Sequence, residues 1–320
     1  MAVYLLFVVG FVFLIKGADW LVDGSAAIAK NYNVSNLVVG LTIVSMGTSM
    51  PELIVNVLAS SKDASQIAIG NILGSNIANI LLILGVSAFI FPIKIKESTV
   101  FYEIPYSIVA LLLVAFVANS NLIGSHENSI NQVDGVILMA FFGLFIAYII
   151  RLAKNGSTDI INDTPDEKTT AGKSILKVLL GTVGLFFGGQ WVVNGAISAA
   201  EHFGLSEAFI GLTVVAIGTS LPELVTSAVA AHRKNTDIAM ANIIGSNIFN
   251  LLWVLGISAI IKPMGFESSL NTDIIILLGA SCLILLSIIT GKVKNQMSKP
   301  TGSLFLLLYL SYIVFLVYRG

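Results

Sequence analysis

Long apolar runs separated by short polar segments dominate the hydrophobic pattern of this chain. Each run has about 20 residues or more, the length of a transmembrane helix rather than the roughly 10 residues of a barrel strand. We expect ten spans, at residues 2–27, 37–60, 66–91, 101–120, 133–152, 173–199, 207–231, 238–261, 271–291 and 301–318. The pattern therefore predicts an all-α polytopic membrane protein.

Composition and charge agree with this class and indicate an orientation. The chain is 56% hydrophobic and 11% charged, whereas soluble domains carry about 25% charged residues. With the N-terminus outside, thirteen of the lysines and arginines fall in cytoplasmic loops, where basic residues concentrate. We therefore expect an N-out/C-out topology. The net charge of −1 gives no reason to expect nucleic acid, and no protein partner is indicated.

The chain contains an internal repeat. Residues 17–85 align without a gap with residues 188–256, at an offset of 171. Because each half has five spans, an odd number, the second half must enter the membrane from the opposite side; such inverted repeats are common in secondary transporters, which bind substrate between the repeats near the midplane. The predicted organisation is a first five-helix repeat at 1–152, a cytoplasmic linker at 153–172 and a second repeat at 173–320, with the strongest matches at about 40–85 and 211–256.

Two glutamates occupy equivalent positions inside apolar spans. The sequence Gly-Thr-Ser-Met-Pro-Glu ends at Glu52, and Gly-Thr-Ser-Leu-Pro-Glu ends at Glu223. A carboxylate in hydrocarbon is costly and indicates function by default. The proline before each glutamate removes the hydrogen bond to the carbonyl four residues earlier, where each copy has a glycine. The predicted helix breaks are at Gly47, Pro51, Gly218 and Pro222.

Further oxygen-bearing side chains share helical faces because they are four residues apart. The pairs are Thr48 with Glu52, Ser75 with Asn79, Thr219 with Glu223, and Ser246 with Asn250. Oxygen ligands without histidine or cysteine favour Na⁺, Ca²⁺ or Mg²⁺ over zinc or copper. Two ionised carboxylates repel each other unless cations lie between them. The protein with an empty site should therefore change its exposure from one side of the membrane to the other less readily than the loaded protein. This difference favours exchange over leak.

Other polar residues lead to weaker expectations. For Asn71, Asn76, Asn242 and Asn247, a role in the site and simple hydrogen bonding between helices both remain open. Asp19 and Asp23 are expected near the membrane boundary, paired with Lys16. Four acidic residues near span ends are expected in water: Glu97, Glu103, Asp134 and Asp273.

Each copy of the glutamate motif is followed by a second similar motif, Gly-Asn-Ile-Leu-Gly-Ser-Asn-Ile at 70–77 and Ala-Asn-Ile-Ile-Gly-Ser-Asn-Ile at 241–248. Together these motifs resemble the alpha-repeats of the cation/calcium exchanger superfamily. The resemblance is closest to prokaryotic sodium/calcium exchangers, and it covers the whole layout in outline. It implies an antiporter of a prokaryotic cell (inner) membrane that exchanges Ca²⁺ for Na⁺ by alternating access. These ions would be its partners, without a resident cofactor.

The resemblance also implies a ligand set. Glu52 and Glu223 would be the carboxylates shared by Ca²⁺ and Na⁺. Further side-chain ligands would be Thr48, Ser49, Thr219, Ser220, Ser75, Ser246, Asn79 and Asn250, and the backbone carbonyls of Ser45 and Ala216 would contribute as well. The first and sixth spans would slide over the core as a gating pair.

One departure and three alternatives qualify this interpretation. Asn250 stands where some family members, including potassium-dependent ones, carry an aspartate, so potassium coupling is not expected. A Ca²⁺/H⁺ or other cation/proton exchanger would share the two glutamates. An intramembrane acid protease would need aspartates in motifs that this chain lacks, so an enzyme is not expected. An ion channel would conduct without a counter-ion.

Overall fold

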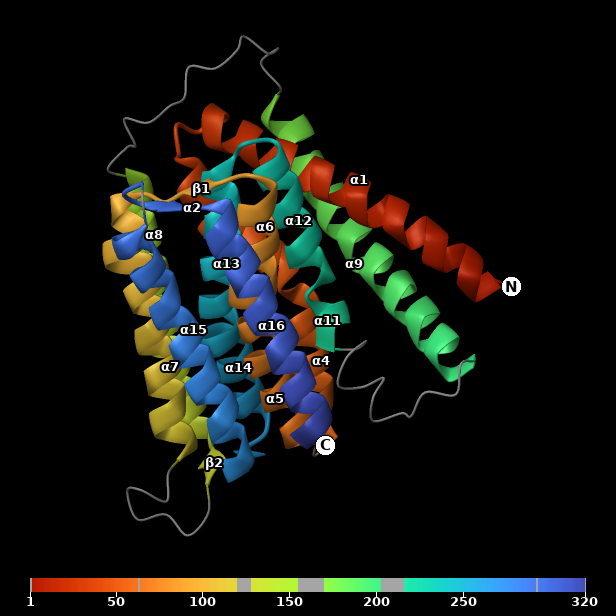
Figure 1. Ribbon diagram of the computed structural model, residues 1–320, viewed down its shortest axis with the longest axis vertical. Helices are drawn as coiled ribbons and strands as arrows, with labels where there is room; N and C mark the ends of the chain where they lie inside the picture. Colours follow the sequence, from red (N-terminus) through yellow and green to blue (C-terminus); the bar gives the residue numbers. More distant parts are fainter. Residues whose placement is uncertain are drawn as a thin grey trace.

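The structure, a computed structural model, describes residues 2–62, 64–119, 128–154, 170–202, 216–291 and 293–319. It is a bundle of long helices, with two of them tilted along one side (Figure 1). The first half contains α1 (Ala2–Asn31), α2 (Asn36–Val39), η1 (Gly40–Val44), α3 (Ser45–Thr48), α4 (Met50–Ser61), α5 (Ser65–Ile77), η2 (Ala78–Ile83), α6 (Leu84–Ile90), β1 (Ile93–Lys94), η3 (Thr99–Glu103), α7 (Ile104–Ala118), β2 (Ser129–Ile130) and α8 (Gln132–Lys154). The second half contains α9 (Ala171–His202), α11 (Ala216–Thr219), α12 (Leu221–His232), α13 (Thr236–Ile248), η6 (Phe249–Val254), α14 (Leu255–Ile261), β3 (Met264–Gly265), η7 (Ser268–Leu270), α15 (Asn271–Thr290), β4 (Gln296–Met297) and α16 (Lys299–Arg319).

The prediction of a polytopic helical membrane protein is confirmed. Within the described ranges, eight helices are long and apolar enough to cross a membrane, and the bent pair Asn36–Thr48 and Met50–Ser61 makes a ninth span if counted as one. The expected span at 207–231 is described only from residue 216 onward, so the count of ten stays a prediction. Residues 155–169 of the predicted linker at 153–172 lie outside the described residues.

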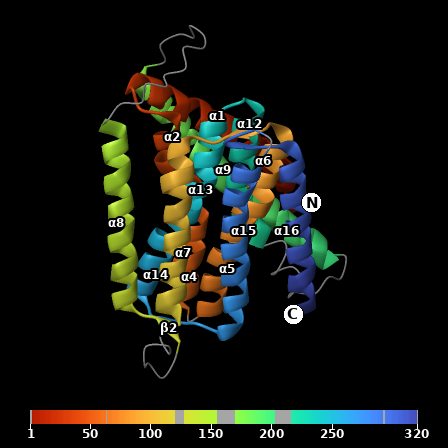
Figure 2. The same cartoon turned by 60° about the vertical axis from the view of Figure 1, so that its left-hand side comes forward.

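Two spans form the centre of the bundle. In Ser65–Ile90 and Thr236–Ile261, 78% and 83% of the most apolar window is buried inside the protein, against 17% in Gln132–Lys154. Figure 2 shows the last of these, α8, at one edge of the bundle. Because the hydrophobic residues of an outer span face lipid, α8 can be apolar without being buried. The polar motifs of the repeat therefore lie on the most enclosed helices.

The secondary structure repeats with the same offset as the sequence. The bounds of α4, α5, η2, α6 and β1 recur 171 residues later as those of α12, α13, η6, α14 and β3. The strands pair antiparallel between the halves, β1 with β4 and β2 with β3. Strand β1 lies at the upper end of the bundle and β2, with its partner β3, at the lower end (Figure 1). Equivalent strands thus lie at opposite ends, as expected of repeats that enter a membrane from opposite sides.

Helices α1 and α9 pack side by side through glycines spaced seven residues apart (Figure 1). The glycines are Gly10, Gly17 and Gly24 on α1, and Gly181, Gly188 and Gly195 on α9. A Cβ atom at Gly17 would lie 2.8 Å from the backbone nitrogen of Leu185, and one at Gly181 would lie 2.6 Å from that of Leu21. The two backbones therefore approach at a distance that only glycine permits.

Asp19 and Asp23 have a different partner from the one expected. The guanidinium of Arg233 contacts both carboxylates, at 2.6 Å from Asp19, and the Lys177 amine lies 3.9 Å from Asp23. Arg233 immediately follows α12, and Lys177 belongs to α9. These ion pairs connect α1 to α9 and to the end of α12. The partners are far apart in the sequence, so the sequence alone did not indicate the pairing.

The expectation that all four acidic residues near span ends are in water is wrong for two of them. Glu103 is fully buried and accepts a hydrogen bond from the Tyr148 hydroxyl. Asp273 is also buried, and it accepts hydrogen bonds from the Tyr312 hydroxyl and the Arg319 guanidinium, both at 2.8 Å. These partners belong to other helices, α8 and α16, so the position within a span alone did not reveal the burial.

The close packing of α1 on α9 generates a stability prediction. We expect Gly17→Leu to lower the free energy of unfolding by about 1–3 kcal/mol, because the new side chain overpacks the contact. Thermal unfolding of the purified protein in detergent measures the change. Gly143→Leu is the matched control, since a Cβ there meets nothing within 4 Å. Equal melting temperatures for the two variants would contradict the proposed contact.

Candidate cation-binding site

Each repeat contains a helix that is interrupted just before its glutamate. Helix α3 ends at Thr48, and α4 begins at Met50 after Ser49, which has φ −83° and ψ 5°. The two pieces are bent by 46°. The second repeat has the same break at Ser220, with φ −87° and ψ 5°. Both breaks lie between the predicted glycine and proline, and each proline sits in the first turn of the next helix, where no hydrogen-bond donor is needed.

These breaks place both glutamates at the start of a half-helix. Glu52 lies in the first turn of α4 and Glu223 in the first turn of α12, and both are fully buried. The positive end of the helix dipole favours a carboxylate at this position. Ser49 of the first repeat donates a hydrogen bond of 3.1 Å to Oε1 of Glu223, so the glutamates belong to one site between the repeats.

Much of the carboxylate surface has no protein donor. Both oxygens of Glu52 and Oε2 of Glu223 are buried without a hydrogen-bond partner among the described residues. An unpaired buried charge is strongly destabilising. A cation would supply the missing interaction. The geometry therefore favours an ion bound between the glutamates.

Two wide helical turns carry the next pair of candidate ligands. Asn79 lies in the π-helical segment η2, and Asn250 lies in its equivalent η6. Segment η2 packs against α12, and η6 packs against α4, so each segment contacts the helix that carries the glutamate of the other repeat. Such π-helical turns are frequent at functional sites. These turns could not be predicted from the sequence, because no proline or glycine interrupts the pattern within them.

The amides of these two asparagines are oriented by bonds between the repeats. The Nδ2 of Asn79 donates to Oδ1 of Asn247 at 3.0 Å, and the Nδ2 of Asn250 donates to Oδ1 of Asn76 at 3.1 Å. Their own Oδ1 atoms are buried and have no hydrogen-bond partner in the described part of the chain. Each amide thus presents its oxygen, rather than its nitrogen, as the free group.

The threonines of the duplicated motif make a matching pair of contacts. The Thr48 hydroxyl donates to Oδ1 of Asn242 at 3.1 Å, and the Thr219 hydroxyl donates to Oδ1 of Asn71 at 3.2 Å. The Thr48 oxygen also lies 3.4 Å from the Ser246 hydroxyl. These contacts again connect the two repeats.

Other predicted ligands are placed less uniformly. The hydroxyl oxygens of Ser75 and Ser220 are buried without a hydrogen-bond partner among described residues, as expected of atoms awaiting an ion. The Ser45 carbonyl, in contrast, accepts a hydrogen bond from the Ser49 amide at 3.0 Å, and the oxygen of Thr48, whose single proton goes to Asn242, lies 3.3 Å from it. A cation at Ser45 would use the lone pair that the Ser49 amide leaves. Ala216 is the first residue of α11, at the position equivalent to Ser45.

One polar residue beside the site was missed by the sequence analysis. Asn56 is fully buried, donates to the carbonyl of Glu52 at 3.0 Å, and has an Oδ1 without a hydrogen-bond partner among the described residues. It follows Glu52 by four residues, the same spacing that identified the other pairs. It did not stand out in the repeat because its counterpart is a serine, Ser227. The Ser227 hydroxyl accepts a hydrogen bond from Asn242 at 2.9 Å.

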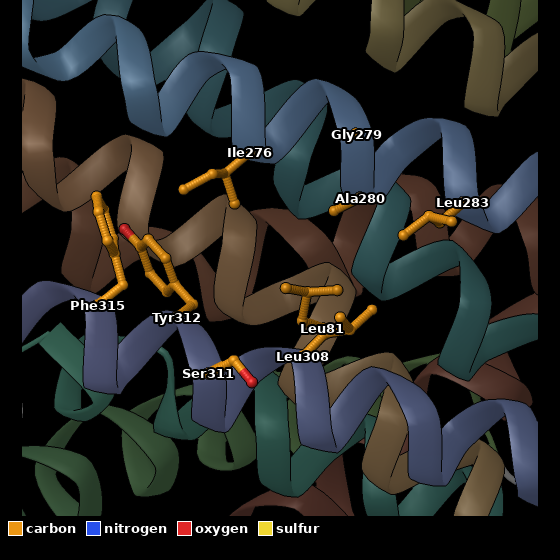
Figure 3. A pocket seen from close by; sticks show the side chains of 9 residues that line it. All are labelled: Leu81, Ile276, Gly279, Ala280, Leu283, Leu308, Ser311, Tyr312 and Phe315. Carbon is orange, nitrogen blue, oxygen red and sulfur yellow. The ribbon is translucent and has the colours of Figure 1, made fainter.

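An apolar cavity elsewhere in the bundle does not share this chemistry. Its volume is about 320 Å³, and it lies among α15, α16 and η2 (Figure 3). Its lining side chains are those of Leu81, Ile276, Ala280, Leu283, Leu308, Ser311, Tyr312 and Phe315, together with Gly279. Carboxylates and amides are absent from that lining, so the candidate cation site remains the one between the repeats.

Comparisons with known proteins show the family of this chain. Residues 2–151 and 173–318 match the family described as sodium/calcium exchanger protein. The chain is 36% identical to the putative antiporter CaxA of Alkalimonas amylolytica over 312 residues, covering 95% of each chain. It is 32% identical to the sodium/calcium exchanger MaX1 of Methanosarcina acetivorans over 347 residues, covering 98% of each. A solved structure of the sodium-calcium exchanger NCX_Mj, without Na⁺ and Ca²⁺, superposes with a TM-score of 0.81 at 35% identity, covering 98% of each chain.

The buried glutamate pair generates a binding prediction. We expect Glu52→Gln and Glu223→Gln each to weaken Ca²⁺ binding by more than about 100-fold, since loss of even outer-shell groups costs about 10- to 100-fold. Calorimetric titration of the purified protein with Ca²⁺ measures the effect. Glu97→Gln is the matched control, because Glu97 is exposed and pairs with Lys294. Near-normal binding by either buried variant would rule out the shared site.

Proposed function

This chain belongs to the sodium/calcium exchanger family, and from that premise we propose that it exchanges Ca²⁺ for Na⁺ across the cell membrane. As a member of this family it is a multi-pass membrane transporter and not an enzyme. In the proposed mechanism, both ions bind between the two repeats near the membrane midplane, and the site opens to one side at a time.

The observation that carries the proposal is the pair of buried carboxylates, Glu52 and Glu223, surrounded by neutral oxygen acceptors. One Ca²⁺ offsets two negative charges, and so do two Na⁺ ions. The two kinds of ion therefore compete for the same oxygens. The empty site holds unpaired negative charge in a low-dielectric interior. This charge opposes the conformational change that moves access to the site from one side of the membrane to the other. This penalty couples the movement of one ion to the return of the other.

Oxygen chemistry supports calcium as the divalent ion. Ca²⁺ takes six to eight oxygen ligands in flexible geometry, which mixed carboxylate, amide and hydroxyl groups supply well. Asn250 is neutral and fully buried, so the site holds two carboxylates rather than three at the positions we assign. With less negative charge available, we propose that exchange does not require K⁺.

A Ca²⁺/H⁺ exchanger is the second candidate, because protons can neutralise the same glutamates. A buried carboxylate without a partner readily accepts a proton, and both oxygens of Glu52 lack a hydrogen-bond partner among the described residues. The relative MaX1 is described as a sodium/calcium exchanger, whereas CaxA is described only as a putative antiporter, without a coupling ion. The experiment must therefore separate the driving gradients.

We expect purified protein in liposomes to take up Ca²⁺ when an outward Na⁺ gradient is imposed. Separate K⁺ and H⁺ gradients of the same size should drive little uptake, because neither ion is the proposed counter-ion. Radioactive Ca²⁺ accumulation measures each arm. Glu223→Gln vesicles provide the control for leak.

Uptake driven by the proton gradient, with no response to Na⁺, would replace the sodium assignment by Ca²⁺/H⁺ exchange. Rapid Ca²⁺ flux without any counter-ion gradient would instead indicate a channel and overturn both candidates.

A further inference from the structure

Four asparagines that lie just outside the candidate ligand set make equivalent contacts across the repeats. Asn242 and Asn71 accept the hydroxyl protons of Thr48 and Thr219. Asn247 and Asn76 accept amide protons from Asn79 and Asn250. The two threonine contacts are equivalent to each other, and so are the two asparagine contacts. In each case, exchanging the two repeats converts one contact into the other. Every acceptor is an Oδ1 atom, and every donor belongs to a predicted ligand.

We propose that Asn71, Asn76, Asn242 and Asn247 are positioning residues that take up the donor hydrogens of the ligands and leave only oxygen lone pairs facing the ion. The inference rests on the proposed function, in that the ion is Ca²⁺ or Na⁺. It assigns a common role to the four asparagines for which the sequence left two interpretations open.

The need for such residues follows from the chemistry of the ligands. A hydroxyl has one proton and two lone pairs, and a primary amide carries two protons on nitrogen beside an oxygen of similar size. A threonine or asparagine next to a cation must therefore direct its protons elsewhere. An amide that turned its nitrogen towards the ion would replace attraction by repulsion.

Two of the four asparagines are themselves held in the required orientation. The Nδ2 of Asn242 donates to the Ser227 hydroxyl at 2.9 Å and to the Glu223 carbonyl at 3.5 Å. The Nδ2 of Asn76 donates to the backbone carbonyl of Asn247 at 3.3 Å. With their nitrogens committed to protein acceptors, Asn242 and Asn76 can present only their oxygens to the ligands. The Nδ2 of Asn71, in contrast, is buried without a hydrogen-bond partner among the described residues.

The free atoms of the site show the result. The oxygens left buried without a hydrogen-bond partner, among described residues, include Oδ1 of both Asn79 and Asn250. The nitrogen of each of these two amides bonds to Asn247 or Asn76, so its oxygen points to the opposite side. Outer-shell residues that orient metal ligands are worth about 10- to 100-fold in affinity.

The test is a double-mutant cycle on Asn76 and the ligand that it orients. We expect Asn76→Ala to lower Ca²⁺ affinity by about 10- to 100-fold. A residue that acts only through Asn250 loses its effect once that ligand is gone, so Asn250→Ala and the double variant should bind Ca²⁺ equally well. Calorimetric titration of the purified full chain measures all three variants.

A matched control comes from a similar amide pair elsewhere. Asn119 and Asn271 exchange two hydrogen bonds of 2.9 Å between α7 and α15, away from the predicted ligands. Asn271→Ala removes an interhelical asparagine contact, so it tests for a general loss of helix packing. We expect its Ca²⁺ affinity to equal that of the wild type.

Unchanged affinity in Asn76→Ala would overturn the inference, and so would losses that multiply in the double variant, since independent effects are additive in free energy. If Asn76→Ala does not fold, the equivalent pair Asn247→Ala and Asn79→Ala gives the same test in the other repeat. The cycle is read from Ca²⁺ binding alone. A wild type that binds Ca²⁺ but shows no Na⁺-driven uptake would therefore end the proposed function, while the cycle would still decide this inference.

Discussion

The burial of two carboxylates in the centre of a membrane protein is the constraint on which the rest of this structure depends. Glu52 and Glu223 are fully buried, and most of their oxygens have no protein donor among the described residues. Each sits at the start of a half-helix, where backbone dipoles offset part of the charge. The helix breaks, the surrounding oxygen atoms and the proposed need for a cation all follow from that burial.

The duplication supplies each half with the groups that it lacks. Thr48 and Thr219 reach asparagines of the opposite repeat, and Asn79 and Asn250 do the same. The two halves cannot complete these contacts alone, because each donor finds its acceptor in the other half. An arrangement with equivalent elements at opposite ends also gives the site similar surroundings on both sides, which suits a transporter that opens to each side in turn.

Departures from the repeat mark where the halves differ. Ser49 donates to Glu223, whereas the equivalent Ser220 hydroxyl has no hydrogen-bond partner among the described residues. Asp19 and Asp23 join α1 to Arg233, while their counterparts Gln190 and Asn194 are uncharged and cannot form the same ion pairs. The two repeats are therefore equivalent in their main contacts but not identical in hydrogen bonding or charge.

The sequence alone determined the class of protein, the repeat and the two glutamates, because hydrophobic length and an ungapped offset are linear properties of the chain. It also located both helix breaks, since proline acts on its own helix. Only the tertiary structure decided which polar atoms meet. The wide turns at Asn79 and Asn250, the burial of Glu103 and Asp273, and the pairing of Asp23 with Arg233 all depend on helices far apart in sequence. A periodic pattern reports the face on which a side chain lies, but not the neighbour that packs against that face.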